Sequence, residues 1–345
     1  MNRNRFLPGL MILLLIMVVA FTGSCQKLKI STLRANYYFN QANSSFTDNE
    51  YRQAIEQYEK ALEYNPKLIQ AYQYLGESYK QMYRPGDESE ENLDRAQKAL
   101  EALNKAYEID PNDKNVIHSL ADMHNRMQAF EDAEKFYLKI LEMEPTNLSN
   151  YYVVAEFYKS YAGQTEEKEE GEEGEESEVT GKTPFQKAEE MYLRRIETDP
   201  DNPQGLSYIA QFYGNMSPIP DFDKAVYYYK LQTKLDPDNA VAWYSIGATR
   251  FFHAYRLQNQ LTMNQKIALG KEAEEALLKA IELDPNYPDP YAYMKILYVN
   301  IFAPLYPERR DWYNSEANRY GDLFTELRER ILERKELKKE LTKIE

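Results

Sequence analysis

The stretch AYEIDPNDKN, Ala106–Asn115, marks the end of one expected helix and the start of the next. Proline disfavours helical geometry in the residue before it, so the first helix is expected to end near Asp110. Asn112 and Asp113 offer side-chain oxygens that can accept hydrogen bonds from the free backbone N–H groups of the following helix. The stretch therefore predicts a junction between two helices.

Related phrases recur along the chain, and each contains a proline preceded by an acidic or amide residue. The six prolines are Pro66, Pro111, Pro145, Pro200, Pro237 and Pro285, at intervals of 45, 34, 55, 37 and 48 residues. Alanine stands twelve residues before every one of them, at Ala54, Ala99, Ala133, Ala188, Ala225 and Ala273. The phrase therefore marks a repeat of about 34 residues that is interrupted by insertions.

Large and small residues recur in the same alignment. Eight residues before each proline stands Tyr58, Leu103, Tyr137, Tyr192, Tyr229 or Leu277. The eighth position of each repeat is small, at Ala42, Gly76, Ala121, Ala155, Ala210 and Gly247. Apolar residues at helical spacing, with small ones where two helices cross, indicate pairs of packed helices.

This pattern resembles the tetratricopeptide repeat (TPR) family over about Ala35–Tyr298. The resemblance implies an all-α fold, a right-handed superhelical solenoid of antiparallel helix pairs with about six to seven repeats. Each pair consists of a helix A and a helix B, and stacked pairs bury a continuous core. The solenoid is expected over residues 35–300.

Four insertions are expected in or beside the turns from helix A to helix B. They lie around residues 82–92, 162–184, 216–221 and 258–266, and the second is expected to be a disordered acidic loop. Residues 166–182 contain nine Glu and two Lys, a local charge of −7. Two readings stay open: the turns form a docking edge, or the loops are merely tolerated because long loops cost little free energy.

The last repeat departs from the pattern, since Lys295 occupies the small eighth position. Residues 301–345 are expected to be capping helices, because a solenoid needs a polar end. A partner-binding coiled coil formed by the charged C-terminal helix is the alternative.

The N-terminus resembles a bacterial lipoprotein signal. Arg3 and Arg5 precede an apolar run, Leu10–Phe21, which is shorter than the approximately 20 residues of a membrane-spanning helix. The resemblance implies a signal peptide over residues 1–24, lipid attachment at Cys25 and a tether over residues 25–34. Thr22 departs from the aliphatic residue typical three positions before the cysteine, so an uncleaved anchor stays open. Gln26 implies a place on the outer membrane, facing the periplasm.

Composition and motifs argue against several functions. A net charge of −14 argues against binding nucleic acid through its phosphates. Gly174 and Gly181 are separated by six residues, where a phosphate-binding loop needs four. His118 and His124 are six apart, so they do not share a helix face as metal ligands would. We expect no catalytic residues, no cofactor, no metal and no small-molecule substrate.

In the resembled family, positions 2, 5, 9, 12 and 13 of helix A line a concave groove. These positions give the candidate groove residues Asn36, Phe39, Asn43, Gln73, His118, Asp122, Asn125, Arg126, Tyr152, Glu156, Gln211, Asn215, Tyr244, Phe251 and Phe252. They also give Glu77, Lys80, Lys159 and Gln204, among others. No position 5 is lysine, which argues against the family subtype that grips a peptide's terminal carboxylate with lysine there.

The sequence thus predicts a non-catalytic scaffold or assembly factor, lipid-anchored in the bacterial cell envelope, with a protein partner of unknown identity. Two alternatives stay open. One is an accessory subunit of an envelope enzyme that docks through the insertion edge. The other is a carbohydrate-active enzyme that uses carboxylates in its loops.

Overall fold

The computed structural model describes residues 30–169, 181–215 and 220–342, without the side chains of residues 164–169 and 341. Within these ranges the chain is helical and contains no strand. The predicted lipid-attachment site Cys25 and residues 170–180 of the acidic insertion lie outside the described residues. The chain divides into an N-terminal body, Met1–Asn150, and a C-terminal body, Tyr151–Glu345, and each is described by itself.

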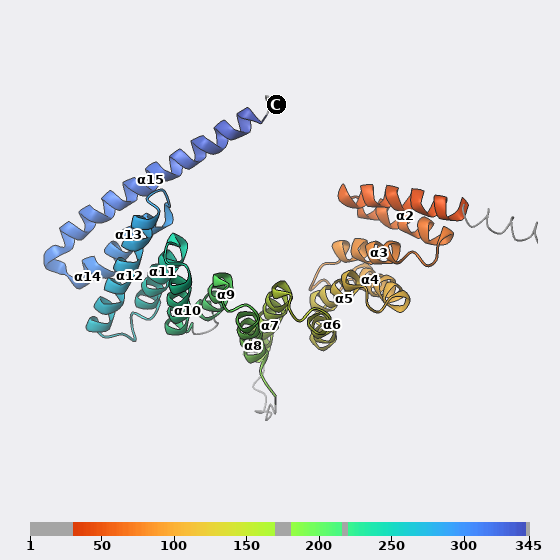
Figure 1. Cartoon of the computed structure of the whole chain (residues 1–345), viewed down its shortest axis with the longest axis horizontal. Coiled ribbons are helices and arrows are strands. Elements are labelled where there is room, and N and C mark those ends of the chain that lie inside the picture. The colour runs from red at the N-terminus through yellow and green to blue at the C-terminus, as the bar shows by residue number, and fades with distance from the viewer. Residues whose placement is uncertain (1–29, 170–180, 216–219, 343–345) are drawn as a thin grey trace, which may run out of the picture. The chain divides into compact units, whose positions relative to one another are not determined.

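Consecutive helices in each body pair as antiparallel hairpins (Figure 1). The N-terminal body contains a helix over residues 30–47, α2 (Tyr51–Tyr64), α3 (Ile69–Met82), α4 (Glu90–Ile109), α5 (Lys114–Arg126) and α6 (Phe130–Met143). The C-terminal body contains most of α7 (Leu148–Glu169), then α8 (Pro184–Thr198), α9 (Pro203–Gly214), α10 (Phe222–Leu235), α11 (Ala240–Arg256) and α12 (Met263–Leu283). It ends with α13 (Asp289–Leu297), a π-helix (Tyr298–Phe302), α14 (Ala303–Leu305), a short 3-10 turn (Pro307–Arg309) and α15 (Arg310–Leu341). The all-α solenoid of helix pairs that the sequence predicts is thereby confirmed.

The proline phrases form the turns from helix B to helix A, as predicted. Helix α4 ends at Ile109, and the side chain of Asp113 accepts hydrogen bonds from the backbone N–H groups of Asn115 and Val116 at 2.9 and 3.3 Å. The corresponding acceptors at three of the other five turns are Asn147, Asn202 and Asn239. At all four turns the residue two positions after the proline therefore caps the new helix.

The closest approach of two helices occurs where position 8 of helix A meets helix B. A Cβ atom added at Gly76 would lie 2.6 Å from Cγ of Leu103 and 3.0 Å from the backbone oxygen of Ala99. Gly247 shows the same distances to Leu277 and Ala273. These three residues stand at the three positions that define the sequence repeat. The repeat pattern therefore arises from this crossing of helix A and helix B.

Small and large residues are matched within each pair. Repeats with glycine at position 8 have leucine eight residues before the proline, whereas repeats with alanine have tyrosine there. Ala42 and Tyr58 share one buried cluster, and Ala210 and Tyr229 share another. Alanine, with its methyl group, is thus paired with the planar ring of tyrosine, and glycine, which has no side chain, is paired with the branched side chain of leucine.

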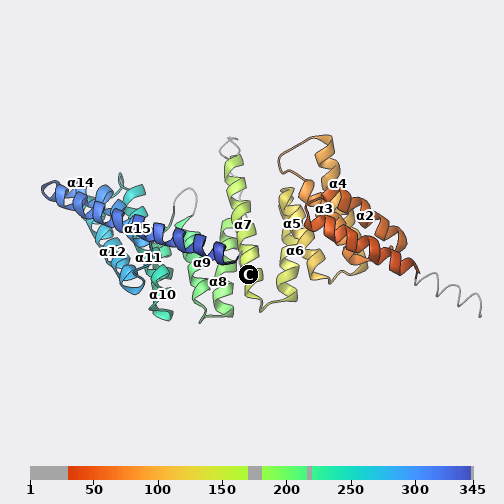
Figure 2. The same cartoon turned by 90° about the horizontal axis from the view of Figure 1, so that it is seen from above.

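In the last helix pair the sizes are reversed: helix A carries the large residue at the crossing and helix B carries the small one. Lys295 occupies the normally small position of α13, and the small residue is Gly321 of α15. A Cβ atom at Gly321 would lie 3.0 Å from both Cδ and Nζ of Lys295. Helix α15 continues past α13 (Figures 1 and 2), and from residue 328 to 340 only Ile331 is partly buried. Its first half is therefore helix B of a seventh pair.

The insertions fall between helix A and helix B of one repeat, as predicted. They separate α3 from α4, α7 from α8, α9 from α10 and α11 from α12. Three expected boundaries fall inside helices, however. Residues 30–34 of the expected tether are helical, α7 continues to Glu169 within the expected disordered loop, and residue 300 lies inside the π-helix.

Replacement of Gly76 by alanine tests the close crossing. We expect Gly76→Ala to destabilise the fold by about 1–3 kcal/mol, because the new methyl group would overlap Leu103. Leu103→Ala alone should cost about 2–5 kcal/mol through the cavity that it leaves. The double variant should lose less than the sum, since the methyl group then enters that cavity; urea denaturation measures all three.

Gly163→Ala is the matched control. Gly163 also lies within a helix, but a Cβ atom there meets nothing within 4 Å. This variant should be neutral or more stable by up to about 1 kcal/mol, because alanine favours helix more than glycine does. Additive losses in the Gly76 and Leu103 cycle would contradict the account of the crossing.

Candidate functional site

The groove positions of the first repeat carry aromatic and amide side chains that contact their own repeat or the next. The ring of Phe39 lies 5.8 Å from that of Tyr58 and 6.4 Å from that of Tyr74. The hydroxyl of Tyr58 donates a hydrogen bond of 2.7 Å to Oδ1 of Asn43. Asn36 is exposed. Of these candidates, Asn36 is therefore the most accessible.

The second and third repeats bring charged groove positions together. Lys80 of α3 is only 5% exposed, and its Nζ lies 2.8 Å from a carboxylate oxygen of Glu77 and 2.7 Å from one of Asp122. Nε of Arg126 lies 3.3 Å from the same oxygen of Asp122. Because Asp122 belongs to α5, this cluster joins the faces of two consecutive A helices.

Three further candidates of the N-terminal body are half-buried, namely Gln73, His118 and Asn125. Burial lowers the pKa of His118, because the charged imidazolium loses contact with water, while nearby Glu144 opposes this shift. His118 therefore has a reduced tendency to carry a charge at this surface.

The C-terminal body brings four candidates to one pocket of about 190 Å³. Gln211 and Asn215 come from α9, and Tyr244 and Phe252 come from α11. Ala210, Gly214, Phe222, Tyr229, Ser245, Ala248 and Thr249 complete the lining. The pocket thus lies between the groove positions of the fifth and sixth repeats.

Phe251 differs from the other candidates. Its side chain is 3% exposed and belongs to the buried cluster that includes Met294 and Leu297. Its ring centroid lies 5.9 Å from that of Tyr293. Phe251 therefore packs the sixth repeat onto the seventh, and its neighbour Phe252, which is 39% exposed, is the accessible aromatic residue.

The fourth and fifth repeats meet through two tyrosines. The ring centroids of Tyr152 in α7 and Tyr208 in α9 are 4.4 Å apart. Glu156 accepts a hydrogen bond of 2.5 Å from the hydroxyl of Tyr192 and pairs with Nζ of Lys159 at 2.5 Å. Tyr152 thus lies at the surface of this junction, while the carboxylate of Glu156 is occupied by partners within its own repeat.

Five residues before each turn proline, helix B buries a side chain in the junction with the next repeat. These residues are Ala61, Ala106, Ile140, Arg195, Gln232 and Ala280, and all six are buried. Two of them are polar and leave buried atoms without a hydrogen bond, namely Nε and Nη1 of Arg195 and Oε1 of Gln232. The fourth and fifth repeats therefore place polar groups where the others place apolar ones.

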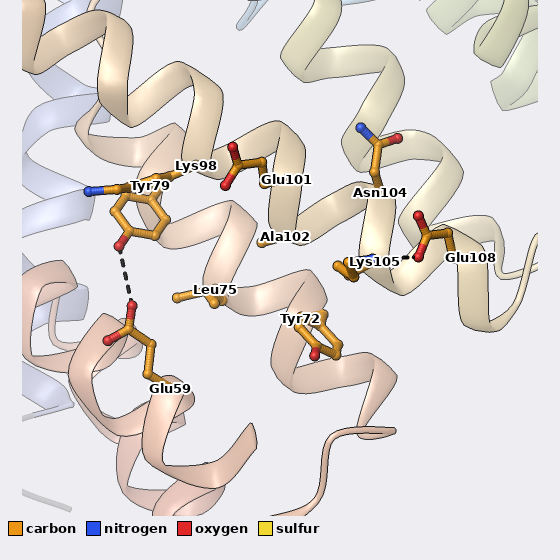
Figure 3. A pocket seen from close by; sticks show the side chains of 10 residues that line it. All are labelled: Glu59, Tyr72, Leu75, Tyr79, Lys98, Glu101, Ala102, Asn104, Lys105 and Glu108. Atoms are coloured by element: carbon orange, nitrogen blue, oxygen red, sulfur yellow. Dashed lines mark hydrogen bonds and ion pairs between the residues drawn. The ribbon is translucent and has the colours of Figure 1, made fainter. Parts of the chain in front are cut away.

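A larger hollow, of about 630 Å³, lies elsewhere in the N-terminal body (Figure 3). It is lined by α2, by a different face of α3 and by α4, and it contains none of the candidate groove residues. Its charged groups are partly paired: the hydroxyl of Tyr79 lies 3.5 Å from Glu59, and Lys105 pairs with Glu108 at 2.7 Å. Sequence reasoning gave no sign of this hollow.

Two sequence profiles match the chain. One described as "TPR repeat" covers residues 42–82, and one described as "Tetratricopeptide repeat" covers residues 89–113. The first segment contains Gly76, and the second contains its crossing partner Leu103 and the phrase around Pro111.

The chain contains tetratricopeptide repeats.

Solved structures of other proteins are similar to this chain, and a TPR repeat-containing protein among them shares its fold. The C-terminal part of a TPR repeat-containing protein from Cytophaga hutchinsonii is 14% identical, with a TM-score of 0.52 over 84% of this chain and 95% of that one. A TPR protein from Parabacteroides merdae is 12% identical, with a TM-score of 0.43 over 86% and 97% of the two chains. Pseudomonas aeruginosa pilF is 14% identical, with a TM-score of 0.42 over 75% and 96%. No curated protein sequence matches the chain.

Proteins built from TPR repeats are generally non-catalytic scaffolds, and the two matches support a protein-interaction scaffold. Among the described residues, no three His, Cys, Asp or Glu side chains are placed to hold a metal ion. In the same part of the chain, no helix is both long and apolar enough to span a membrane.

The prediction of groove residues missed Arg195 and Gln232, the two polar side chains that are buried in the junctions between repeats. The sequence does carry a signal for them, since counting back five residues from Pro200 and Pro237 reaches Arg195 and Gln232. That position gives alanine in three of the other four repeats. A departure of this kind identifies a polar group inside an otherwise apolar junction.

Proposed function

We propose that this TPR chain binds a segment of another protein along the exposed face of its A helices, without a catalytic step of its own. The observation that supports this most is the pocket between α9 and α11, where four predicted groove residues from two repeats line one hollow. An extended segment or a helix that follows the A helices would reach this pocket from successive repeats.

The chemistry of the pocket suits a peptide. The hydroxyl of Ser245 donates to the backbone oxygen of Val241, and that of Thr249 donates to the backbone oxygen of Ser245. The oxygen of Thr249 therefore keeps its lone pairs as acceptors, while the side-chain amides of Gln211 and Asn215 can donate as well as accept. Phe252 adds an aromatic anchor, the type of residue that supplies much of the binding energy at interfaces.

Peptide selection tests the proposed groove. A display library of random dodecapeptides is selected on the purified protein, and enriched peptides are synthesised for fluorescence anisotropy. We expect the double variant Asn215→Ala, Phe252→Ala to bind these peptides at least about tenfold more weakly, which corresponds to about 1.4 kcal/mol.

The matched control is Tyr227→Ala, which removes a 57% exposed aromatic residue from α10, a B helix. It should bind as the wild type does, and circular dichroism should show that both variants keep their helix content. Equal affinity of the wild type and the double variant would overturn the groove proposal.

We further propose that the chain is exported and lipid-anchored through Cys25 to the bacterial cell envelope, at the outer membrane and facing the periplasm. The support is the sequence alone: Arg3 and Arg5, the apolar run Leu10–Phe21 and the small residues Gly23 and Ser24 before the cysteine. The anchor would hold the first repeat close to the membrane surface, since few residues separate Cys25 from the first helix at residue 30.

Substitution of the cysteine tests the anchor. In a bacterial host fed a radiolabelled fatty acid, the wild-type chain should incorporate label, and Cys25→Ser should incorporate none and retain residues 1–24. Ser24→Ala, which keeps a small residue before the cysteine, should be labelled as the wild type is. Continued labelling of Cys25→Ser would exclude lipid attachment at this residue.

A further inference from the structure

Arg195 is a buried cation in a position that four of the other five repeats fill with alanine or isoleucine. Its side chain is 4% exposed, whereas Ala61, Ala106 and Ala280 occupy the same place in other helix B segments. The next A helix makes room for it, because a Cβ atom at Gly205 would lie 3.0 Å from Nη1 of Arg195. The guanidinium group is thus built into the junction between the fourth and fifth repeats.

Among the described residues this guanidinium group forms no direct ion pair, and the carboxylate of Asp199 acts on it only from a longer distance. Nε and Nη1 are buried and make no hydrogen bond there, and Nη2 donates only a long bond of 3.4 Å to Oε1 of Gln204. The guanidinium carbon, Cζ of Arg195, lies 5.0 Å from the centre of the Tyr208 ring. A buried charge without a paired counter-charge costs several kcal/mol, so Arg195 reduces the stability of the fold.

The residues that cover Arg195 face the proposed groove. Gln204 occupies a predicted groove position, its side chain is exposed, and its amide nitrogen donates to the hydroxyl of Tyr208 at 2.8 Å. The rings of Tyr208 and Tyr152, another groove candidate, lie 4.4 Å apart beside it. Rotation of the Gln204 side chain would therefore open a path from the groove to Nη2.

We propose that Arg195 is the receptor for a carboxylate group of the bound protein segment, either an Asp or Glu side chain or a free C-terminus. The carboxylate replaces the amide oxygen of Gln204 and accepts hydrogen bonds from the guanidinium group, whose planar donors match a carboxylate. Tyr152 and Tyr208 contact the neighbouring part of the segment.

A single carboxylate fits this place better than a phosphate. Arg195 offers a single guanidinium group, and Lys159, at a groove position of α7, is already paired with Glu156. This inference rests on the proposed peptide-binding groove. It differs from a lysine clamp on helix A, because the cation comes from helix B of the preceding repeat.

The test uses the peptides that the dodecapeptide library yields on the wild-type protein. Each acidic residue is replaced by its amide, and each free C-terminus is amidated. We expect one of these changes to weaken binding to the wild type at least tenfold and to change binding to Arg195→Met less than twofold. Methionine fills a similar volume without charge, so Arg195→Met should also raise the thermal midpoint.

Two further variants separate recognition from a purely structural role. Gln204→Ala removes the cover of the guanidinium group and should strengthen binding of the carboxylate peptide severalfold, which also keeps the test valid if Arg195→Met fails to fold. Arg194→Ala removes an equal charge from the adjacent, exposed residue, which pairs with Glu190, and should bind as the wild type does.

The outcomes distinguish the two proposals. If no peptide is enriched, or if enriched peptides ignore the Asn215 and Phe252 substitutions, the groove proposal fails. If peptides bind in the groove but loss of their carboxylates has equal effects on the wild type and Arg195→Met, the groove stands and the role of Arg195 is overturned. Unchanged or weaker binding of the carboxylate peptide to Gln204→Ala would also contradict the proposed role of Arg195.

Discussion

The close crossing of helix A and helix B is the constraint on which the rest of this solenoid depends. At Gly76 and Gly247 the two helices approach so closely that a single methyl group would overlap a leucine side chain. Side chains in protein interiors fill space at crystal-like density, so the two sides of such a crossing must be matched in size. The pairs of glycine with leucine, alanine with tyrosine, and Lys295 with Gly321 are three solutions to one steric requirement.

Because the crossing fixes the rotation of each A helix, it also decides which residues remain for a partner. One face of α9 and α11 packs against the B helices, and another lines the pocket that contains Asn215 and Phe252. The same geometry directs the end of each helix B into the following repeat. Most repeats fill that junction with apolar side chains, and the guanidinium group of Arg195 lies there at a cost in stability.

The sequence predicted the helix pairs, the turns and the sites of the insertions, because each depends on residue size and local backbone chemistry at fixed spacing. Asp113 could be expected to cap a helix from the sequence alone. The burial of Phe251 could not, since it depends on the seventh helix pair, whose residues depart from the repeat. The hollow beside Tyr79 was also inaccessible to sequence reasoning, because it arises from three helices whose spacing no motif records.

Hydrogen–deuterium exchange with and without a selected peptide tests most directly whether the A helices carry the function. The account predicts that the bound peptide slows amide exchange in α9 and α11 and leaves the B helix α12 unchanged, because α12 contributes no residue to the pocket. Slower exchange in α2 and α4, which line the hollow in Figure 3, with no change in α9 and α11, would contradict it.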